Sequence, residues 1–479
     1  MNLLFEKSQP GRGSSLIGPC DVEMYSPGEE YSRKTPLLLP ELSESDISRH
    51  YSALERRAHG VNNGFYPLGS CTMKYNPAVN EKIAGMSGFC DVHPLQPDHT
   101  AQGCLEVLAL AGDYLCEITG MDNISLQPAA GAHGEFTGIA LIKQYHRSRG
   151  DLKRDKLIIP DSSHGTNPAT SAMTGMRIVN IPTKPDGRVD TDMLKQAAGG
   201  DTAGLMLTNP NTLGLFEKDI LKITEIIHDA GGLVYCDGAN MNAIMGVARP
   251  GDMGFDCIHL NLHKTFATPH GGGGPGAGAL GCKSHLSQFL PSPVIAKTGS
   301  GYSRQSPGSQ SIGRVKGFDG NFLVVLKALA YILTLGGEGI VQTAHNAVLN
   351  ANYLMKLLSE CYTVAYPGQC MHEFVLSMEK EADEKGITAS DIAKALIDHG
   401  IHPPTVYFPL IVREALMVEP TETEGKETLD MAAGAFLSIY RAAIENPQAV
   451  KTAPVSTPVG RPDEVTAARN PVIKYTPGV

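Results

Sequence analysis

A single lysine, Lys264, stands between a histidine and a run of glycines in the stretch NLHKTFATPHGGGGPGAG, residues 261–278. Two kinds of chemistry fit such a stretch, a phosphate-binding loop and a reactive amine. Gly271, Gly273 and Gly276 satisfy the G-x-G-x-x-G spacing of a dinucleotide loop, but that loop needs a strand directly before it and a helix opening within it. Prolines flank the glycine run, and the segment before it lacks strand character. We therefore disfavour a dinucleotide site.

Two histidines near the lysine, His259 and His263, are four residues apart. This spacing suits metal ligands on one face of a helix, but the segment IHLNLH alternates apolar and polar residues with the period of a strand. A metal would also need carboxylate or thiolate ligands nearby, and none stands at ligand spacing. We predict no metal site.

Lys264 is therefore interpreted as a reactive amine at the end of a buried strand. A lysine amine has a pKa of about 10.4, so at neutral pH it reacts only when it is activated or already committed as a Schiff base. Pyridoxal phosphate (PLP) is the obvious carbonyl cofactor. It requires a phosphate cradle, contacts on both ring faces and an acid at the pyridine nitrogen.

Residues suited to each of these needs follow one another along the chain. Residues 130–132 precede a predicted helix start, whose free amides suit a phosphate. His164 is placed to stack on one ring face, Asp237 closes the strand LVYCD and would keep the ring nitrogen protonated, and Ala239 is small enough for the ring to lie against it. Each residue alone is more often a turn, cap or surface residue, but their order favours the cofactor. The candidates are Ala130, Gly131, Ala132, His164, Asp237, Ala239 and Lys264.

The elements that must position these residues are visible from about residue 100 onward. Helical patterns there alternate with short apolar runs, among them KLIIPDSSH, RIVNIP, GLMLTNPNT, LVYCDGAN and IHLNLHK. The alternation predicts an α/β fold, a mainly parallel sheet flanked by helices, with ligands at the carboxyl ends of the strands. We predict an extended N-terminal arm over 1–75, a large cofactor-binding domain over 76–330, and a small α+β domain with a tail over 331–479. A long apolar helix near residues 322–335 is predicted before the small domain, and two amphipathic segments, TASDIAKALIDHG from Thr388 and KETLDMAAGAFLSIYRAAIE from Lys426, predict helices within it.

The composition excludes several classes of protein. A chain of 479 residues with 42% apolar content can bury a large core, and a net charge of −10 argues against general nucleic-acid binding. Ten cysteines without a C-x-x-C pair indicate reduced thiols. No signal peptide is evident, and the longest apolar run, from Phe322, contains Lys327 and is too short to span a bilayer. We expect a cytoplasmic protein that binds neither nucleic acid nor a membrane.

Longer motifs carry a resemblance to a known family. They are GSCTMKYNP from Gly69, HPLQPDHTAQG from His93, QPAAGAHGE from Gln127, DSSHGTNPA from Asp161, YCDGANMNA from Tyr235, HLNLHKTF from His259 and EPTE from Glu419. Over about residues 35 to 445, the chain resembles the glycine-decarboxylating P-protein of the glycine cleavage system. The resemblance implies the large domain of the fold-type I PLP-dependent enzymes.

The resemblance also implies a function and partners. The family decarboxylates glycine with PLP and transfers the aminomethyl group to the lipoyl arm of H-protein, as an oxidoreductase of the glycine cleavage system. A chain of this length that carries the lysine resembles subunit 2 of the two-chain form, which implies the lysine-free subunit 1 as partner in an α2β2 assembly. By the same resemblance, Thr208 lies near the phenolic oxygen of the ring and Thr265 near the phosphate, and Lys264 is the candidate proton shuttle.

Five further positions keep two interpretations each. His93, His99 and Lys74 either face the substrate and the lipoyl arm or cover the sheet. Arg413 either binds a carboxylate or marks a turn. Cys71 invites a redox interpretation but is as well explained as an ordinary thiol.

Two other functions also remain open from the sequence. Another fold-type I enzyme, such as an amino-acid decarboxylase or a cysteine desulfurase, would keep Lys264 and Asp237 but need no lipoyl partner. A non-catalytic binding subunit would keep the fold alone, and the presence of the lysine speaks against it.

Overall fold

The computed structural model describes residues 2–13, 18–35, 37–269 and 276–475. Its contacts divide the chain into two units, residues 1–63 and residues 64–479. The first unit contains helices α1 (Leu4–Lys7) and α2 (Glu44–Glu55). Ser43 caps α2 because its Oγ accepts a hydrogen bond from the amide of Asp46 at 3.2 Å. The sequence-based boundaries at 75 and 330 stay predictions.

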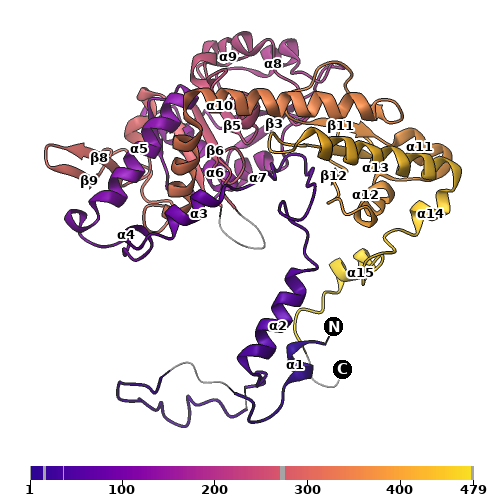
Figure 1. Cartoon of the computed structure of the whole chain (residues 1–479). Helices are drawn as coiled ribbons and strands as arrows, with labels where there is room; N and C mark the ends of the chain where they lie inside the picture. Colours follow the sequence, from indigo (N-terminus) through magenta and orange to yellow (C-terminus); the bar gives the residue numbers. More distant parts are fainter. Residues whose placement is uncertain (1, 14–17, 36, 270–275, 476–479) are drawn as a thin grey trace. The chain divides into compact units, whose positions relative to one another are not determined.

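The second unit is built on a mixed, mainly parallel sheet (Figure 1). Among the described residues, seven strands pair in the order β1-β7-β6-β5-β4-β2-β3. The strands from β6 to β3 in this order run parallel, whereas β7 is antiparallel to both of its neighbours. The strands are β1 (Asn123–Ser125), β2 (Lys156–Pro160), β3 (Arg177–Ile181), β4 (Thr202–Thr208), β5 (Leu233–Gly238), β6 (Cys257–Asn261) and β7 (Gly278–Cys282). The sequence prediction of a mainly parallel α/β sheet is confirmed.

The central strands are apolar on both faces because helices cover both faces. In β5, Val234 and Cys236 pack with helices α5, α8, α9 and α10, whereas Leu233 and Tyr235 point to the opposite face and pack with α6. Full burial of one such aliphatic side chain stabilises the fold by about 1.5–3 kcal/mol. In the sequence, these strands are therefore continuous apolar runs that end abruptly in polar residues.

Helices follow the strands on both faces of the sheet (Figure 1). The helices that precede the small sheet in the second unit are α3 (Ala78–Ala84), α4 (Ser87–Cys90), α5 (Gln102–Thr119), α6 (Gly131–Ser148), α7 (Thr166–Met173), α8 (Thr191–Ala197), α9 (Ile220–Asp229) and α10 (Phe322–Leu358). Short 3-10 turns are η1 (Asp98–Thr100), η2 (Met241–Ala243), η3 (Pro250–Met253) and η5 (Ser284–Phe289).

Helix α10 is longer than the apolar run from which it was predicted. It contains 37 residues and is long and apolar enough to cross a membrane, so the expectation that this segment is too short was wrong. The run was measured only to the glycines at 336 and 337, but the helix continues beyond Gly336, whose φ of 62° marks a kink. Both segments of α10 pack into hydrophobic cores, the first against the main sheet and the second against the small sheet. Its apolar composition therefore reflects core packing.

A smaller antiparallel sheet follows, in the order β10-β11-β13-β12. Its strands are β10 (Thr363–Val364), β11 (Phe374–Ser377), β12 (Thr405–Val406) and β13 (Ala415–Val418). Helices α11 (Glu379–Lys385), α12 (Ala389–Asp398), α13 (Lys426–Glu445), α14 (Pro447–Lys451) and α15 (Glu464–Arg469) complete this part. The two amphipathic segments predicted as helices became α12 and α13, and Thr388 and Asp391 form a capping box at the start of α12.

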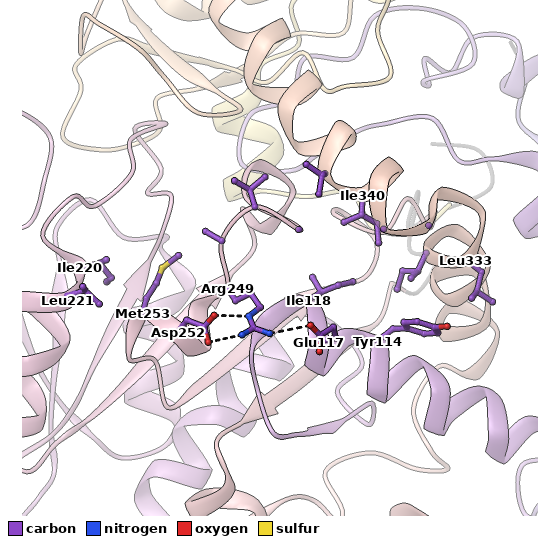
Figure 2. Close-up of a pocket in the computed structure, with 17 residues that line it drawn as sticks. Tyr114, Glu117, Ile118, Ile220, Leu221, Arg249, Asp252, Met253, Leu333 and Ile340 are labelled. Carbon is purple, nitrogen blue, oxygen red and sulfur yellow. Dashed lines mark hydrogen bonds and ion pairs between the residues drawn. The ribbon is translucent and has the colours of Figure 1, made fainter.

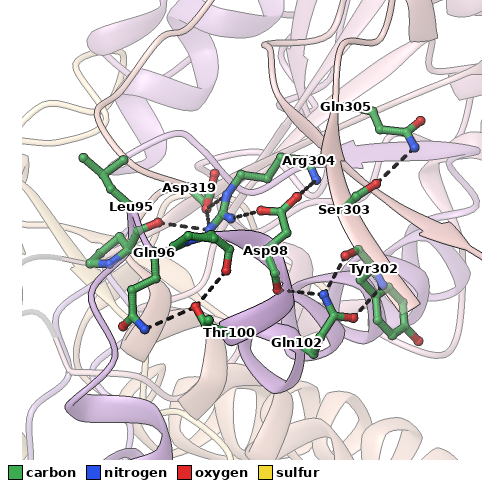
Figure 3. A network of polar contacts seen from close by, with 12 residues as sticks. Leu95, Gln96, Asp98, Thr100, Gln102, Tyr302, Ser303, Arg304, Gln305 and Asp319 are labelled. Carbon is green, nitrogen blue, oxygen red and sulfur yellow. Dashed lines mark hydrogen bonds and ion pairs between the residues drawn. The ribbon is translucent and has the colours of Figure 1, made fainter. Parts of the chain in front are cut away.

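A two-stranded hairpin of β8 (Val294–Thr298) and β9 (Gly301–Gln305) is held by a polar network (Figure 3). Arg304 pairs with two carboxylates, Asp98 and Asp319, the latter at 2.8 Å. Gln102 donates to the carbonyl of Tyr302 at 2.8 Å and accepts from its amide at 2.8 Å. The network thus fixes the hairpin to the start of α5 by directional contacts.

We expect Arg304→Ala to loosen this hairpin selectively. The Arg304 side chain is only 20% exposed, and the loss of its charge-assisted bonds should cost about 2 kcal/mol. Amide hydrogen exchange in β8 and β9 should then accelerate roughly 30-fold. The matched control is Arg177→Ala, because Arg177 also bridges two aspartates, Asp155 and Asp201, but is 50% exposed. Equal acceleration in both variants, each measured at its own site, would contradict this role for Arg304.

Candidate active site

Three neighbouring parallel strands, β4, β5 and β6, end at one edge of the main sheet. In the sheet register Thr208 lies beside Asp237, and Asp237 lies beside His259. Lys264 follows β6 in a turn, in which its amide donates to the carbonyl of Asn261 at 3.0 Å. The carboxyl ends of these strands therefore bring Thr208, Asp237 and Lys264 to the same edge, where parallel sheets bind ligands.

Asp237 is buried, with 2% of its surface exposed, and is surrounded by donors. Asn167 donates to one carboxylate oxygen at 3.1 Å, and the Ala239 amide donates to the other at 3.0 Å. The Nε2 atom of His259 lies 3.5 Å from the second oxygen. Burial raises the pKa of Asp237, but His259, Asn167 and the Ala239 amide together bring it below the ordinary value. Asp237 is therefore an anion at neutral pH.

His259 supports Asp237 from the neighbouring strand. Its Nδ1 is hydrogen bonded to the hydroxyl of Tyr235, and its Nε2 faces Asp237. Burial lowers the pKa of His259, so the ring is neutral. The tautomer with the proton on Nε2 satisfies both contacts, because Tyr235 can then donate to Nδ1. The sequence indicated only that His259 lies in a strand and gave no sign of this support.

A second buried carboxyl group, Glu135 of α6, lies close to Asp237. It accepts hydrogen bonds from Thr166 at 2.6 Å, Thr170 at 3.2 Å and Asn167 at 3.2 Å. Burial and the charge of Asp237 raise the pKa of Glu135 to about 8. Glu135 therefore keeps its proton at neutral pH, and the negative charge of the pair stays on Asp237. Asn167 connects the two groups, and its motif, DSSHGTNPA, was the only sequence signal for it.

Lys264 is buried, with 8% of its surface exposed. Its Nζ donates to the carbonyl oxygen of Ser70 at 2.7 Å. Ser70 has a φ of 62°, the left-handed region that residues other than glycine rarely adopt. The loop before the sheet thus holds the lysine amine by a strained residue, and this contact was not predicted from the sequence.

His164 lies half-buried near the same strand ends. Its Nδ1 accepts from the amide of Thr166 at 3.2 Å, and its ring makes an edge contact with Phe408, with centroids 5.5 Å apart. Burial lowers the pKa of His164, so a neutral, flat ring is available for stacking. Ala239 is partly exposed at the end of β5, and its small side chain leaves the Asp237 edge open.

The start of α6 offers free backbone donors. Ala130 is its N-cap with extended backbone, and no side chain caps the helix; the amides of Gly131 and Ala132 lie in its first turn. A Cβ at Gly131 would come within 2.5 Å of the Asn261 side chain. Glycine is therefore required for α6 to approach the end of β6.

The residues present fit PLP. Thr208 Oγ1, Thr265 Oγ1 and Asn261 Oδ1 are buried without a hydrogen-bond partner among the described residues, and such groups normally find one. They occur at the ends of β4 and β6, near the anionic Asp237 and the amine of Lys264. Uncapped helix amides, a strand-end carboxylate and a lysine are the set that a phosphorylated pyridine aldehyde requires.

The structure decides among the other candidates. Lys74 is buried in contacts with Glu422 at 2.6 Å and the Thr265 carbonyl at 2.6 Å, so it is a structural cation. Arg413 is exposed and pairs with Glu379 and Asp383 of α11, which favours the interpretation as a surface residue.

His93 and His99 are exposed in the segment that leads to α5, and their substrate-facing role stays a prediction. Burial raises the pKa of the Cys71 thiol, and Glu419 raises it further, whereas Lys264 lowers it. A raised pKa favours the unreactive thiol form and argues against a redox role. Gly271 and Gly273 of the glycine run lie outside the described residues.

A large pocket lies elsewhere on the main domain (Figure 2). It has a volume of about 1010 Å³ and is lined by residues of α5, α9 and α10, with Arg249 between Glu117 and Asp252. Ile118, Leu333 and Ile340 make much of its lining apolar. None of the residues predicted to bind the cofactor lines it.

The mixed sheet, the small antiparallel sheet and the lysine after β6 define the fold of the fold-type I PLP-dependent enzymes. A family model for the glycine cleavage system P-protein matches residues 25–308, and one for the glycine dehydrogenase C-terminal domain matches residues 343–458. The chain belongs to the P-protein family of the glycine cleavage system.

Curated relatives cover the chain almost completely. A Treponema denticola protein named "Probable glycine dehydrogenase (decarboxylating) subunit 2" is 57% identical over 473 residues, which is 99% of this chain and 98% of the relative. A Thermotoga petrophila protein of the same name is 54% identical over 472 residues, 98% of this chain and 99% of the relative. Within the family, the chain therefore groups with subunit 2.

Solved structures show the same fold at low identity. A glycine decarboxylase (P-protein) in inhibitor-bound form has a TM-score of 0.72 at 22% identity and covers 86% of this chain and 93% of its own. Glutamate decarboxylase from Lactobacillus brevis has a TM-score of 0.67 at 11% identity and covers 87% of this chain and 97% of its own. A cysteine desulfurase from Escherichia coli has a TM-score of 0.61 at 17% identity and covers 81% of this chain and 98% of its own.

Proposed function

We propose that this chain decarboxylates glycine with PLP and passes the aminomethyl group to the lipoyl arm of an H-protein, as subunit 2 of a two-chain P-protein. The observation that carries the proposal is the pairing of an anionic Asp237 with Lys264 at adjacent strand ends, within a family named for glycine decarboxylation. Family membership supplies the substrate, and the strand-end residues supply the chemistry.

Backbone amides at the start of α6 and side chains at the strand ends would together hold the cofactor. The amides of Gly131 and Ala132 and the Thr265 hydroxyl would hold the phosphate, and the Thr208 hydroxyl would face the phenolic oxygen. His164 and Ala239 would contact the two ring faces. When bound, PLP supplies a carbonyl for amines and a protonated ring that takes up the electrons left by CO2. Asp237 would keep the ring nitrogen protonated, because it is ionised and accepts hydrogen bonds from Asn167 and the Ala239 amide.

Lys264 has two tasks in this proposal. Its amine would hold the cofactor, and the same amine would serve as the group that carries a proton to or from the substrate carbon. The Ser70 carbonyl, 2.7 Å from Nζ, orients the amine. Glu135 retains its proton and leaves Asp237 as the anion at the ring nitrogen.

The partners follow from the family and are part of the proposal. A chain grouped with subunit 2 implies subunit 1, and an α2β2 assembly in the cytoplasm would bring the lipoyl arm of H-protein to the Lys264 edge of the sheet. The substrate is glycine, and the absence of a metal from the reaction stays a prediction.

The proposal is tested by glycine-dependent exchange of labelled bicarbonate. We expect exchange with the purified chain, PLP, subunit 1 and lipoylated H-protein, and a strong loss when subunit 1 or H-protein is omitted. Alanine and cysteine in place of glycine are the matched substrates, and neither should support exchange. Decarboxylation of another amino acid, or sulfur release from cysteine, without either partner would instead identify a different fold-type I enzyme. A protein that stays colourless with PLP would be a binding subunit.

A further inference from the structure

Two sequence motifs lie against each other, GSCTMK at residues 69–74 and EPTE at residues 419–422, and the proposed function uses only the Ser70 carbonyl from them. Thr72 donates its hydroxyl to Glu419 at 2.5 Å, although 347 positions separate them. The amide of Gly69 donates to the carbonyl of Met417 at 3.3 Å. The loop before the main sheet and the end of β13 therefore form one packed unit next to Lys264.

This unit reaches the lysine through Ser70. The Ser70 carbonyl accepts from Lys264 Nζ at 2.7 Å, and the Ser70 amide donates to a carboxylate oxygen of Glu373 at 2.7 Å. A cation and a carboxyl group thus hold the two sides of one strained residue. A change in the charge of Glu373 therefore changes the electrostatic potential at the Lys264 amine, which is the amine that the proposed reaction uses.

Glu373 and Glu419 form a buried pair of carboxyl groups, exposed by 0% and 1%. They and a ring nitrogen of His372 each offer a ligand atom within 4.8 Å of one another. One oxygen of Glu419 and both ring nitrogens of His372 have no hydrogen-bond partner among the described residues. The pair lies in the dry interior, where two adjacent negative charges are costly.

Few charged groups of the described residues act on the pair. Within that part of the chain, Lys264 is the cation that acts on both carboxyl groups, and Lys74 is already paired with Glu422. Burial raises the pKa of Glu419 to about 7, and burial together with Glu419 raises that of Glu373 well above the ordinary range. At neutral pH the two carboxyl groups therefore hold a proton between them. The titratable groups facing the pair are Lys264, His372, Cys71 and Glu422.

A divalent metal is the alternative occupant of this cluster. A metal ion would need both carboxyl groups to be ionised. The positive charge of Lys264, however, already acts on His372, Glu373 and Glu419. The carboxylate oxygens also already accept bonds from Ser70, Thr72 and, at 3.1 Å, Asn242. These contacts favour a proton over a metal ion.

We propose that Glu373 and Glu419 share one proton and set the protonation state of the Lys264 amine, acting as positioning residues for the lysine. When Nζ loses a proton to become nucleophilic, the pair binds one, so the net charge of the cluster is unchanged. When Nζ is protonated again, the pair releases that proton. The inference rests on the proposed function only in taking Lys264 as the reacting amine.

The test measures the protonation of Lys264 in the full chain freed of cofactor. Acetylation of Lys264 by acetic anhydride, followed across pH and quantified by peptide mapping, reports the neutral amine. We expect the double variant Glu373→Gln/Glu419→Gln to lower the midpoint of this profile by at least about one pH unit, because it removes the single negative charge of the pair, which favours the ammonium form. Labelling at pH 7 should then be about tenfold faster. Glu419→Asp, which keeps the charge of the pair, should leave the profile close to that of the unmodified chain.

The matched control is Glu217→Gln. Glu217 is also buried, with 1% exposed, and burial raises its pKa to about 7, but its carboxylate accepts from the amide of Val189, and the charges that act on it are those of Arg188, Lys184 and Asp186, not that of Lys264. This variant should leave the Lys264 profile unchanged. Should the double variant fail to fold, infrared titration of Lys264→Ala provides the second measurement. The protonated carboxyl band should then persist to higher pH than in the unmodified chain, because the cation has been removed.

Two results would overturn the proposal. One is an unchanged Lys264 profile in the folded double variant Glu373→Gln/Glu419→Gln. The other is one equivalent of Zn²⁺ or Mn²⁺ in the purified chain that is lost in His372→Ala. Neither assay uses glycine or H-protein, so a failed exchange reaction with a shifted profile rejects the proposed function and retains the carboxyl pair.

Discussion

Lys264→Ala should abolish both the colour and the reaction of this protein. The amine of Lys264 is the group at the strand ends that can bind an aldehyde covalently, so the visible absorbance expected after addition of PLP should not appear. Glycine-dependent bicarbonate exchange should fall by at least about 10³-fold, because the nucleophile and the proton carrier are lost together. Absorbance spectra, borohydride reduction with peptide mapping, and the exchange assay measure these effects.

Lys264→Arg and Lys195→Ala are the controls. Arginine keeps a positive charge that can donate to the Ser70 carbonyl but forms no imine, so it should be as inactive as alanine. Lys195 is an exposed residue of α8, and its loss should change nothing. Retention of the visible band in Lys264→Ala, with reduction mapped to a different lysine, would rule out Lys264 as the cofactor anchor.

Asp237→Asn should separate cofactor binding from catalysis. Lys264 remains, so the visible band should form, but the ring nitrogen loses the buried charge that keeps it protonated. Loss of one partner of a buried charge pair costs about 3–5 kcal/mol, so exchange should fall roughly 150- to 5000-fold. The pKa of Glu135 should also fall toward its ordinary value, because the charge of Asp237 is one cause of its rise.

Asp256→Asn is the matched control for Asp237→Asn. Asp256 directly precedes β6 and is buried, and it contacts His228 at 2.9 Å, His285 at 3.3 Å and the Val234 amide at 2.7 Å. It therefore lies at the opposite end of the same strand pair. Its replacement should lower stability but leave exchange per folded molecule unchanged. An equal loss of exchange in both variants would show that Asp237 acts only through the stability of the sheet.

The strands and helices that carry the site could be predicted from local pattern. The run LVYCD became β5 with Asp237 near its end, the predicted helix at KETLDMAAGAFLSIYRAAIE became α13, and the long apolar helix began at Phe322 as expected. These elements follow from side-chain periodicity and from the abrupt change of apolar runs to polar residues, which are properties of neighbouring positions. The length of α10 was missed because a second helical segment follows the kink at Gly336, at a glycine pair that normally ends a helix.

The supporting residues could not be predicted, because their role depends on partners far away in the chain. His259 is an ordinary alternating residue of a strand until Tyr235 and Asp237 lie beside it. Lys74 was a candidate for substrate contact, and only the position of Glu422 shows that Lys74 is already bound in a buried ion pair.

The sequence alone determined the family, and it identified Lys264 as the candidate cofactor lysine and Asp237 as the aspartate that precedes it. Each of these depends on residue type, order and short-range pattern. Only the tertiary structure decided the ionisation of the site. Burial and the distances between charges set whether Asp237 is an anion, whether Glu135 keeps its proton, and whether Glu373 and Glu419 face Lys264. These quantities arise only when segments from opposite ends of the chain exclude water from one another.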